Sequence, residues 1–243
     1  MKTLILKVFA PQASFRRPLD INYQRTLPLP PPSTLIGLAG AALGLSDIQI
    51  WNKPEGESLR NTRVSAILCN NPGLAKDLIT ILKVKNRRIE DRSPYYREVL
   101  FNTEFLIIYH GKEKFIQKLK EGFQNPQYPL SLGREDELID ILSIEEADLQ
   151  PGEPAFRGTA IPGDIRKMDF QLAEFKEKKD YPIKIEPPII ESVPVVFDVT
   201  GKSRIPRKKV TLSFLPYTLE VGIKSPTFEV FSVKGKNFTW MNY

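Results

Sequence analysis

The spacing of apolar residues predicts three elements in the first 70 residues. Thr3–Phe9 is mostly apolar, with Lys7 as its one charge, and predicts a buried strand. In Ser33–Leu45 the apolar residues recur at helical spacing after a run of prolines, which predicts a helix with Ser33 as its N-cap. Arg63–Cys69 is rich in residues that favour strands and predicts a second strand.

Two further elements and an acidic span follow. Val99–Tyr109 predicts a third strand, and Lys112–Phe123 predicts an amphipathic helix with its large apolar residues on one face. Ala75–Leu82 fits a helix or a strand equally well. For the acidic span Glu135–Asp148, a solvated helix face or a contact with a basic neighbour is a more ordinary role than cation binding.

The resulting order is strand, helix, strand, a polar insertion, strand, helix and strand. It predicts an α+β protein with a ferredoxin-like βαββαβ core, the arrangement that RNA-recognition modules also use. We expect this domain to span residues 1–148, with a basic insertion at about 83–98. The composition then shifts toward Pro and Gly, and short strand-like runs follow. Residues 149–243 are therefore predicted to be a Pro-rich connection and a small antiparallel β-domain.

Composition narrows the class of protein only slightly. The 35 Lys and Arg residues exceed the 29 Asp and Glu residues by 6, which makes a polyanion a candidate partner. The single cysteine, Cys69, excludes an internal disulfide and a cysteine-built metal site, so we expect a cytoplasmic protein. The longest nearly apolar run is 12 residues, Thr34–Leu45, whereas a membrane span needs about 20. We expect no membrane association, no metal and no cofactor.

The positive charge gathers in two segments. Lys83–Arg97 holds six basic and two acidic residues together with Tyr95 and Tyr96, and Lys202–Lys209 holds five basic residues and no acid. Basic side chains between tyrosines suit single-stranded nucleic acid, since phosphates meet cations and bases stack on rings. The competing interpretation is a pair of solvated loops. Arg16, Arg17 and Arg25, before the proline run, favour the first interpretation.

Other chemistry is sparse. Gly133 would let the backbone approach a phosphate closely, and Arg134 could complete such a contact. The glycines of the predicted helix, Gly37 and Gly40, do not fit a phosphate-binding motif and indicate close packing of the helix on a sheet. His110 is the only histidine and the one candidate for general acid or base catalysis of RNA cleavage.

Two motifs resemble those of one known family. The first is P-x-P-S/T-x-L-x-G-L-x-G-A, at Pro30–Ala41, after the polar run SFRRP…YQRT; the second is P-x-x-L-G-R, at Pro129–Arg134. In this order and separation they resemble the CRISPR-associated RAMP proteins of the fifth Cas family, the type I Cascade subunit at the 5′ end of the crRNA. The proline-rich entry to the helix is similar to the I-A and I-B branches.

The resemblance implies an RNA-recognition-type core with an inserted thumb-like hairpin and a C-terminal β-region. It implies binding of the crRNA 5′ handle, beside the backbone RAMP subunit and the large subunit, with target DNA near the PAM as a further partner. The implied RNA-contacting residues belong to a loop, the thumb and a Gly-Arg turn: Ser14, Arg16, Arg17, Tyr23 and Arg25; Lys83, Lys85, Arg87, Arg88, Arg92, Tyr95, Tyr96 and Arg97; and Gly133 and Arg134.

Two alternatives to a non-catalytic RNA-binding and assembly subunit remain open. In the I-C-like branch the protein cleaves precursor crRNA without a metal, using a Tyr, a Lys and a His. This chain has His110 on a comparable strand and Tyr23 as a loose candidate, but Tyr109 stands where that branch has Lys. The second alternative is a purely structural subunit whose basic segments dock acidic protein surfaces.

Overall fold

The computed structural model describes residues 1–21, 23–172, 186–201 and 203–242 and shows an α+β protein. Its main sheet contains four long strands in the order β6-β1-β5-β3, and each strand is antiparallel to its neighbours. The strands are β1 (Lys2–Ala13), β3 (Arg63–Leu68), β5 (Arg88–Gly111) and β6 (Asp140–Ala147). Two more strands, β2 (Tyr23–Gln24) and β4 (Gly73–Lys85), pair with the first half of β5.

Helices cover one face of this sheet. Leu4, Leu6 and Val8 of β1 alternate toward a large buried cluster that includes apolar residues of α1 (Pro32–Ala42) and α4 (Glu113–Gln124). Short helical turns continue around this layer: α2 (Asp47–Asn52), η1 (Pro54–Gly56) and α3 (Glu57–Arg60). Among the described residues, no helix is both long and apolar enough to cross a membrane.

The opposite face of the sheet is covered by the end of the chain. Ile5 and Ile108 pack with Phe238 and Trp240, close to the hairpin of β14 (Phe231–Val233) and β15 (Lys236–Phe238). The central part of this face is therefore buried, and bases cannot stack on it.

The remaining strands after residue 149 form small sheets. They are β7 (Gln150–Pro151), β8 (Ala155–Arg157), β9 (Ala160–Pro162), β10 (Phe170–Leu172), β11 (Ile189–Thr200), β12 (Ser203–Phe214) and β13 (Glu220–Ile223), with the turn η2 (Ile165–Lys167). Apolar residues of β11 and β12 belong to the same buried cluster as α1 and α4. The expected domain boundary at 148/149 stays a prediction.

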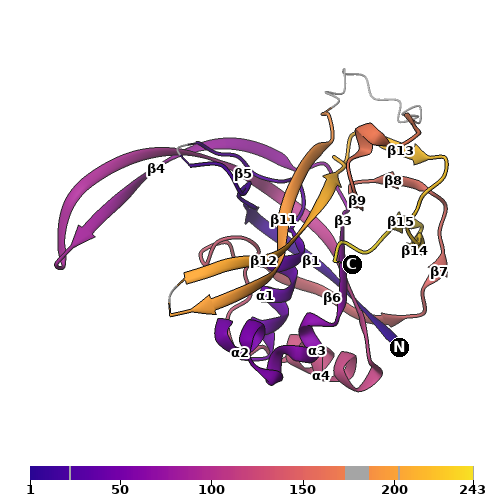
Figure 1. Cartoon of the computed structure of the whole chain (residues 1–243), viewed down its shortest axis with the longest axis horizontal. Coiled ribbons are helices and arrows are strands. Elements are labelled where there is room, and N and C mark those ends of the chain that lie inside the picture. Colours follow the sequence, from indigo (N-terminus) through magenta and orange to yellow (C-terminus); the bar gives the residue numbers. More distant parts are fainter. Residues whose placement is uncertain (22, 173–185, 202, 243) are drawn as a thin grey trace.

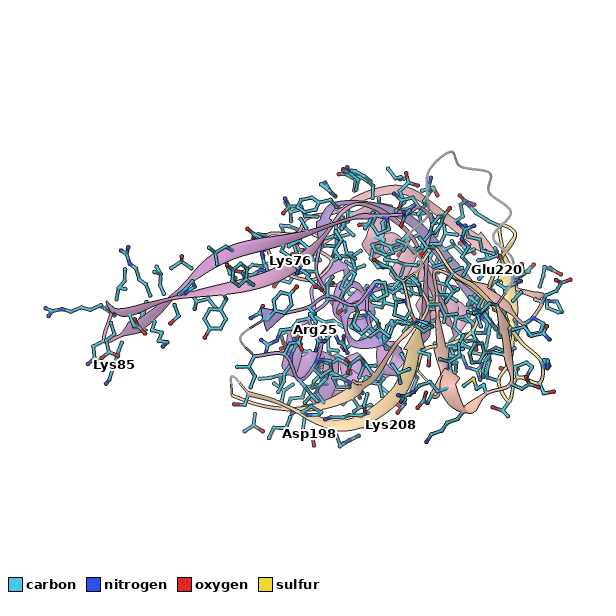
Figure 2. All side chains as sticks on the ribbon, turned by 90° about the horizontal axis from the view of Figure 1, so that it is seen from above. Arg25, Lys76, Lys85, Asp198, Lys208 and Glu220 are labelled. Carbon is cyan, nitrogen blue, oxygen red and sulfur yellow. The ribbon has the colours of Figure 1, made fainter. Side chains whose placement is uncertain are left out.

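Two hairpins project from the body toward the same side of the molecule (Figure 1). The longer joins β4 to β5 through Asn86 and Arg87, whose φ angles of 50° and 63° indicate the type I′ turn that matches strand twist. Lys85 lies near its tip and Lys76 nearer the body (Figure 2). Ala75–Leu82, which fitted a helix or a strand, is the outgoing strand of this hairpin. The second hairpin is β11–β12.

Three local expectations are wrong. Helix α1 begins at Pro32 with Pro31 as N-cap and no side-chain cap, so Ser33 lies inside the first turn. The centre of the acidic span forms β6, so the expected helix face is wrong, whereas the other expected role, contact with a basic neighbour, is confirmed: Glu145 pairs with Lys234 and Glu146 with Lys120, each at 2.7 Å. A Cβ on Gly37 would meet open space and one on Gly40 would meet Ile50 of α2, so neither glycine marks a contact with the sheet.

Candidate nucleic-acid interface

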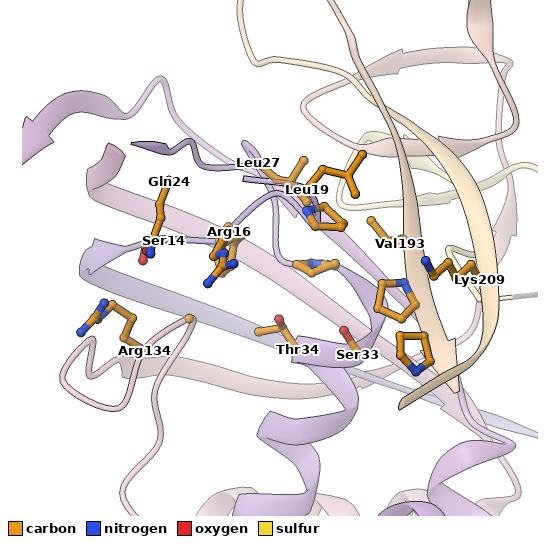
Figure 3. Close-up of a pocket in the computed structure, with 16 residues that line it drawn as sticks. Ser14, Arg16, Leu19, Gln24, Leu27, Ser33, Thr34, Arg134, Val193 and Lys209 are labelled. Carbon is orange, nitrogen blue, oxygen red and sulfur yellow. The ribbon is translucent and has the colours of Figure 1, made fainter. Parts of the chain in front are cut away.

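A pocket of about 550 Å³ joins segments that are far apart in the sequence (Figure 3). We call it the basic pocket. Its walls come from the loop after β1, the first turn of α1, the turn before β6, and the β11–β12 hairpin. The lining residues that matter here are Ser14, Arg16, Leu19, Leu27, Pro31, Ser33, Thr34, Gly133, Arg134, Pro194, Pro206 and Lys209. The two family-like motifs and the arginine-bearing loop therefore meet in one place.

A buried carboxylate holds two of these walls together. Glu137, which is 2% exposed, accepts hydrogen bonds from the Ser14 amide at 2.8 Å and the Ser14 hydroxyl at 2.6 Å. It also accepts one from the Arg134 amide at 2.8 Å, and the Arg97 guanidinium lies 3.9 Å away. Sequence reasoning missed Glu137, because nothing in the acidic span distinguishes the one carboxylate that turns inward.

Gly133 is required at this junction for two reasons. Its φ of 111° lies in a region that side chains rarely adopt, and a Cβ would overlap the Ser14 carbonyl oxygen and the Glu137 carboxylate. The glycine thus lets two backbone segments approach each other, and its predicted contact with a phosphate stays a prediction. Arg134, its neighbour, projects at the edge of the pocket (Figure 3).

The basic pocket is lined by three cations and no carboxylate, counted over the described residues. Arg16 and Lys209 are exposed and form no ion pair within that part of the chain, and Arg134 has one exposed partner, Asp136, at 3.4 Å. The first turn of α1 adds little to this charge, because Pro31 and Pro32 carry no N–H and the Thr34 amide donates to the Pro31 carbonyl at 2.9 Å. Apolar walls beside free cations suit a nucleotide, which carries both a ring and a phosphate.

The two other arginines of the loop are paired inside the protein. Arg17 donates to Glu191 of β11 at 2.6 Å, and Arg25 holds Asp20 through two guanidinium nitrogens at 3.1 and 2.8 Å. The hydrogen bonds from Arg25 lower the pKa of the Asp20 carboxyl. Both arginines were predicted to contact RNA, but their charges are balanced by carboxylates of the same chain. In this structure they shape the loop.

Tyr23 is also tied to the fold. Its hydroxyl donates to Glu98 at 2.6 Å, which with desolvation raises the tyrosine pKa to about 12. Lys76 lies 5.6 Å from the ring centroid. Tyr23 pairs with Tyr96 of β5, which is 55% exposed and offers a ring for stacking. Tyr95, the preceding residue, points to the opposite face and is half-buried.

The predicted thumb residues lie on the β4–β5 hairpin, outside the basic pocket. Lys83 and Lys85 pair with Asp91 and Glu90, at 2.9 and 3.5 Å, and all four side chains are exposed. Arg97 differs: its side chain is 12% exposed and pairs with Asp77 at 2.9 Å. Three exposed arginines form no ion pair with the described residues: Arg87, Arg88 and Arg92.

The structure thus divides the predicted site into two parts. Ser14, Arg16, Gly133 and Arg134 meet at the pocket, and the thumb residues form a separate arm. Lys209 joins the pocket although the motifs do not include it. In the sequence, the feature that pointed to Lys209 was the basic segment Lys202–Lys209. Lys202 itself lies outside the described residues.

The two residues considered for catalysis lie far apart along β5. Tyr23 is beside Tyr96, whereas His110 is 14 residues further along β5, roughly 45 Å at 3.3 Å per residue. His110 bonds to Thr3 at 2.9 Å and stacks on Trp240, and burial lowers its pKa. The structure therefore does not bring Tyr23 and His110 into one site.

The preceding Tyr109 is fully buried, and its hydroxyl donates to the Leu35 carbonyl at 2.8 Å. Burial raises its pKa. Within the described ranges, no three His, Cys, Asp or Glu side chains gather as a metal site would require.

Two solved structures with a similar fold carry CRISPR descriptions. One, described as a CRISPR RNA-guided surveillance complex, aligns at a TM-score of 0.53 with 19% identity, over 95% of this chain and 91% of that chain. A second, a crystal structure of a CRISPR protein from Archaeoglobus fulgidus, aligns at 0.54 with 11% identity, over 98% and 97%. At these identities the likeness concerns the fold alone.

A third, a crystal structure of a Cas protein, is 25% identical but aligns at 0.39, over 56% of this chain and 58% of that chain. No curated protein sequence matches the chain. The family comparison is more direct, because residues 3–181 match the family described as CRISPR-associated protein (Cas_Cas5). That match includes β1, the loop, α1, the long hairpin and the Gly-Arg turn. The chain therefore belongs to the Cas5 family of CRISPR-associated proteins.

Proposed function

We propose that this chain is the subunit of a type I CRISPR Cascade surveillance complex that binds the crRNA 5′ handle and serves in its assembly. The observation that carries the proposal is the basic pocket, where Arg16 and Arg134 face a cavity that no carboxylate of the described residues lines. Phosphates of a single strand would meet these cations, and a base would rest on the exposed apolar side chains of Pro18 and Leu19. We also infer that the core is ferredoxin-like, which the strand order β6-β1-β5-β3 supports.

The long hairpin supports a role in assembly. Leu78, Leu82, Val84 and Ile89 are each 48–61% exposed on it, and an apolar arm of this kind favours a partner that covers it. We propose the backbone RAMP subunit for the arm and the large subunit as a neighbour, with target DNA near the PAM as a further partner. The complex would act in the cytoplasm, in antiviral defence. The solved surveillance complex with a similar fold supports this assignment.

The proposed role is non-catalytic. It is supported by the separation of His110 from Tyr23, and by the burial of Tyr109 where a catalytic lysine would stand in the cleaving branch. Repeat RNA incubated with the purified chain in EDTA should stay intact. Cleavage that disappears in His110→Ala would instead establish the endoribonuclease alternative.

The central test is RNA binding by the purified full-length chain. Fluorescence anisotropy would compare a single-stranded RNA bearing the repeat-derived handle with a scrambled RNA of equal length, across a range of salt concentrations. We expect tighter binding of the handle RNA. Arg16 and Arg134 together should contribute about −1.4 to the slope of log K against log salt, at about 0.7 per contact. Equal affinity for the two RNAs would contradict the proposal.

The variant Arg16→Ala tests one of these cation–phosphate contacts in the same titration. Because Arg16 is exposed and unpaired within the described residues, its loss should reduce the salt slope by about 0.7 without changing stability. Co-expression with the neighbouring CRISPR subunits and the repeat array, followed by sequencing of the co-purified RNA, should give a uniform 5′ end. Heterogeneous 5′ ends would contradict handle binding.

A further inference from the structure

The β11–β12 hairpin carries the second basic segment and lies beyond residues 3–181, which match the family. Its cations are not equivalent. Arg204 pairs with Asp47 of α2, and Arg207 pairs with Asp198 at 3.4 Å. Lys209 is exposed, has no ion-pair partner in the described part of the chain, and lines the basic pocket. One cation of this hairpin is thus available to a ligand at the pocket.

The hairpin is held in a fixed position. The Asn52 side chain donates to the Val199 carbonyl at 2.7 Å and accepts from the Val199 amide at 3.0 Å. Trp51 packs edge-on against Phe197, with ring centroids 5.1 Å apart. These contacts fasten the outer half of the hairpin to α2. Lys209 therefore meets a ligand on a preorganised wall, which lowers the ordering cost of binding.

Two prolines lie beside Lys209 in the pocket wall. Pro194 is its cross-strand partner, and Pro194 and Pro206 both line the pocket beside it. Figure 3 shows Lys209 on one side of the opening and Arg16 and Arg134 on the other. The hairpin therefore supplies both an apolar wall and a cation, the two features that a single-stranded nucleotide requires.

We propose that the β11–β12 hairpin is a second RNA-binding arm, whose Lys209 binds a phosphate of the strand held in the basic pocket opposite Arg16. This inference rests on the proposed function. It assigns RNA contact to a segment outside the predicted thumb, and it makes the C-terminal region part of the handle site.

The test uses the full-length chain and the same handle RNA in anisotropy titrations. Lys209→Ala should weaken binding about fivefold at low salt, as expected for one solvent-accessible charge contact, and should reduce the salt slope by about 0.7. Lys209→Arg should keep the slope of the parent protein. Lys118→Ala, on the exposed face of α4, removes the same charge away from the pocket and should bind as the parent does. A handle RNA with 4-thiouridine near its 5′ end should crosslink to the peptide 193–209.

The outcomes separate the two proposals. Loss of affinity in Arg16→Ala with none in Lys209→Ala would overturn the second arm and leave the proposed function standing. Equal binding of handle and scrambled RNA by the parent protein would overturn both. If Lys209→Ala binds RNA normally but fails to co-purify with a partner subunit, the lysine docks an acidic protein surface and the RNA arm is wrong.

Discussion

At the scale of single residues, the pocket depends on groups that contact no ligand. The Glu137 carboxylate joins the loop at Ser14 to the turn at Arg134 through three hydrogen bonds, and the Arg97 guanidinium at the base of the long hairpin lies 3.9 Å away. A buried acceptor of this kind fixes the relative position of the segments that it joins. The cations of the pocket can then stand free, because the loop does not need them for its own stability.

Glu137→Gln tests this role. Glutamine removes the negative charge that accepts these hydrogen bonds, and its amide nitrogen, in place of Oε1, would face the Arg97 guanidinium, so we expect a loss of about 1–3 kcal/mol in the free energy of unfolding, measured with urea. Glu135→Gln, at an exposed neighbouring position, should change it by less than about 0.5 kcal/mol. Equal unfolding midpoints for the two variants would show that Glu137 does not hold the loop.

His110 predicts a dependence of stability on pH. Burial is the main cause of its lowered pKa, and the positive charges of Arg63 and the N-terminus lower it further, while Glu229 opposes them. As the pH falls below about 6.5, the unfolded chain takes up this proton before the folded protein does. This part of the stability is therefore complete above pH 6.5 and is lost as the pH falls through the folded pKa.

Urea unfolding at pH 7.5 and pH 5 should show a larger loss of stability at low pH for the parent protein than for His110→Gln. The remaining pH dependence of the variant comes from other groups and serves as the control. Identical differences between the two pH values would remove His110 as the cause.

At the scale of elements, α1 combines two glycines with opposite surroundings. A Cβ on Gly37 would meet nothing within 4 Å, whereas one on Gly40 would overlap the Ile50 side chain of α2, which is buried. Gly37→Ala should therefore raise the free energy of unfolding by up to about 1 kcal/mol, the usual helix preference for alanine. Gly40→Ala should lower it, since Ile50 would have to repack. Thermal or urea unfolding of the pair measures this, and changes of the same sign would contradict the packing.

At the scale of the whole molecule, the long hairpin is separable from the core. Ile79 pairs with Tyr95, so joining these residues through Asn-Gly removes residues 80–94 and keeps the register. Nearly all of the removed side chains are exposed, and we expect the free energy of unfolding to change by less than about 1 kcal/mol. The affinity for handle RNA and its salt slope should both fall, because Arg87, Arg88 and Arg92 are lost.

Two results for this deletion variant would contradict the prediction. A loss of several kcal/mol would mean that the hairpin contributes to the folded core. Unchanged RNA affinity and salt slope would mean that the arm contacts protein alone.

Local periodicity was enough to predict much of the core. The strands predicted at Thr3–Phe9, Arg63–Cys69 and Val99–Tyr109 and the helix at Lys112–Phe123 all lie within or nearly within observed elements. Each has a buried face whose apolar spacing can be read from neighbouring residues alone. For the acidic span only the contact with basic neighbours was correct; the helix face was wrong because the edge strand β6 carries charges that also fit a helix surface.

The sequence by itself determined the family motifs, the order of the core elements and the presence of two basic segments. The tertiary structure alone decided which cations remain available. Arg17 meets Glu191, 174 positions away, Arg25 meets Asp20, and Arg97 meets Asp77 and Glu137, whereas Arg16 and Lys209 line one pocket. The physical reason is that a charge is neutralised by whichever carboxylate the fold places within a few ångströms, and separation along the chain does not limit that choice.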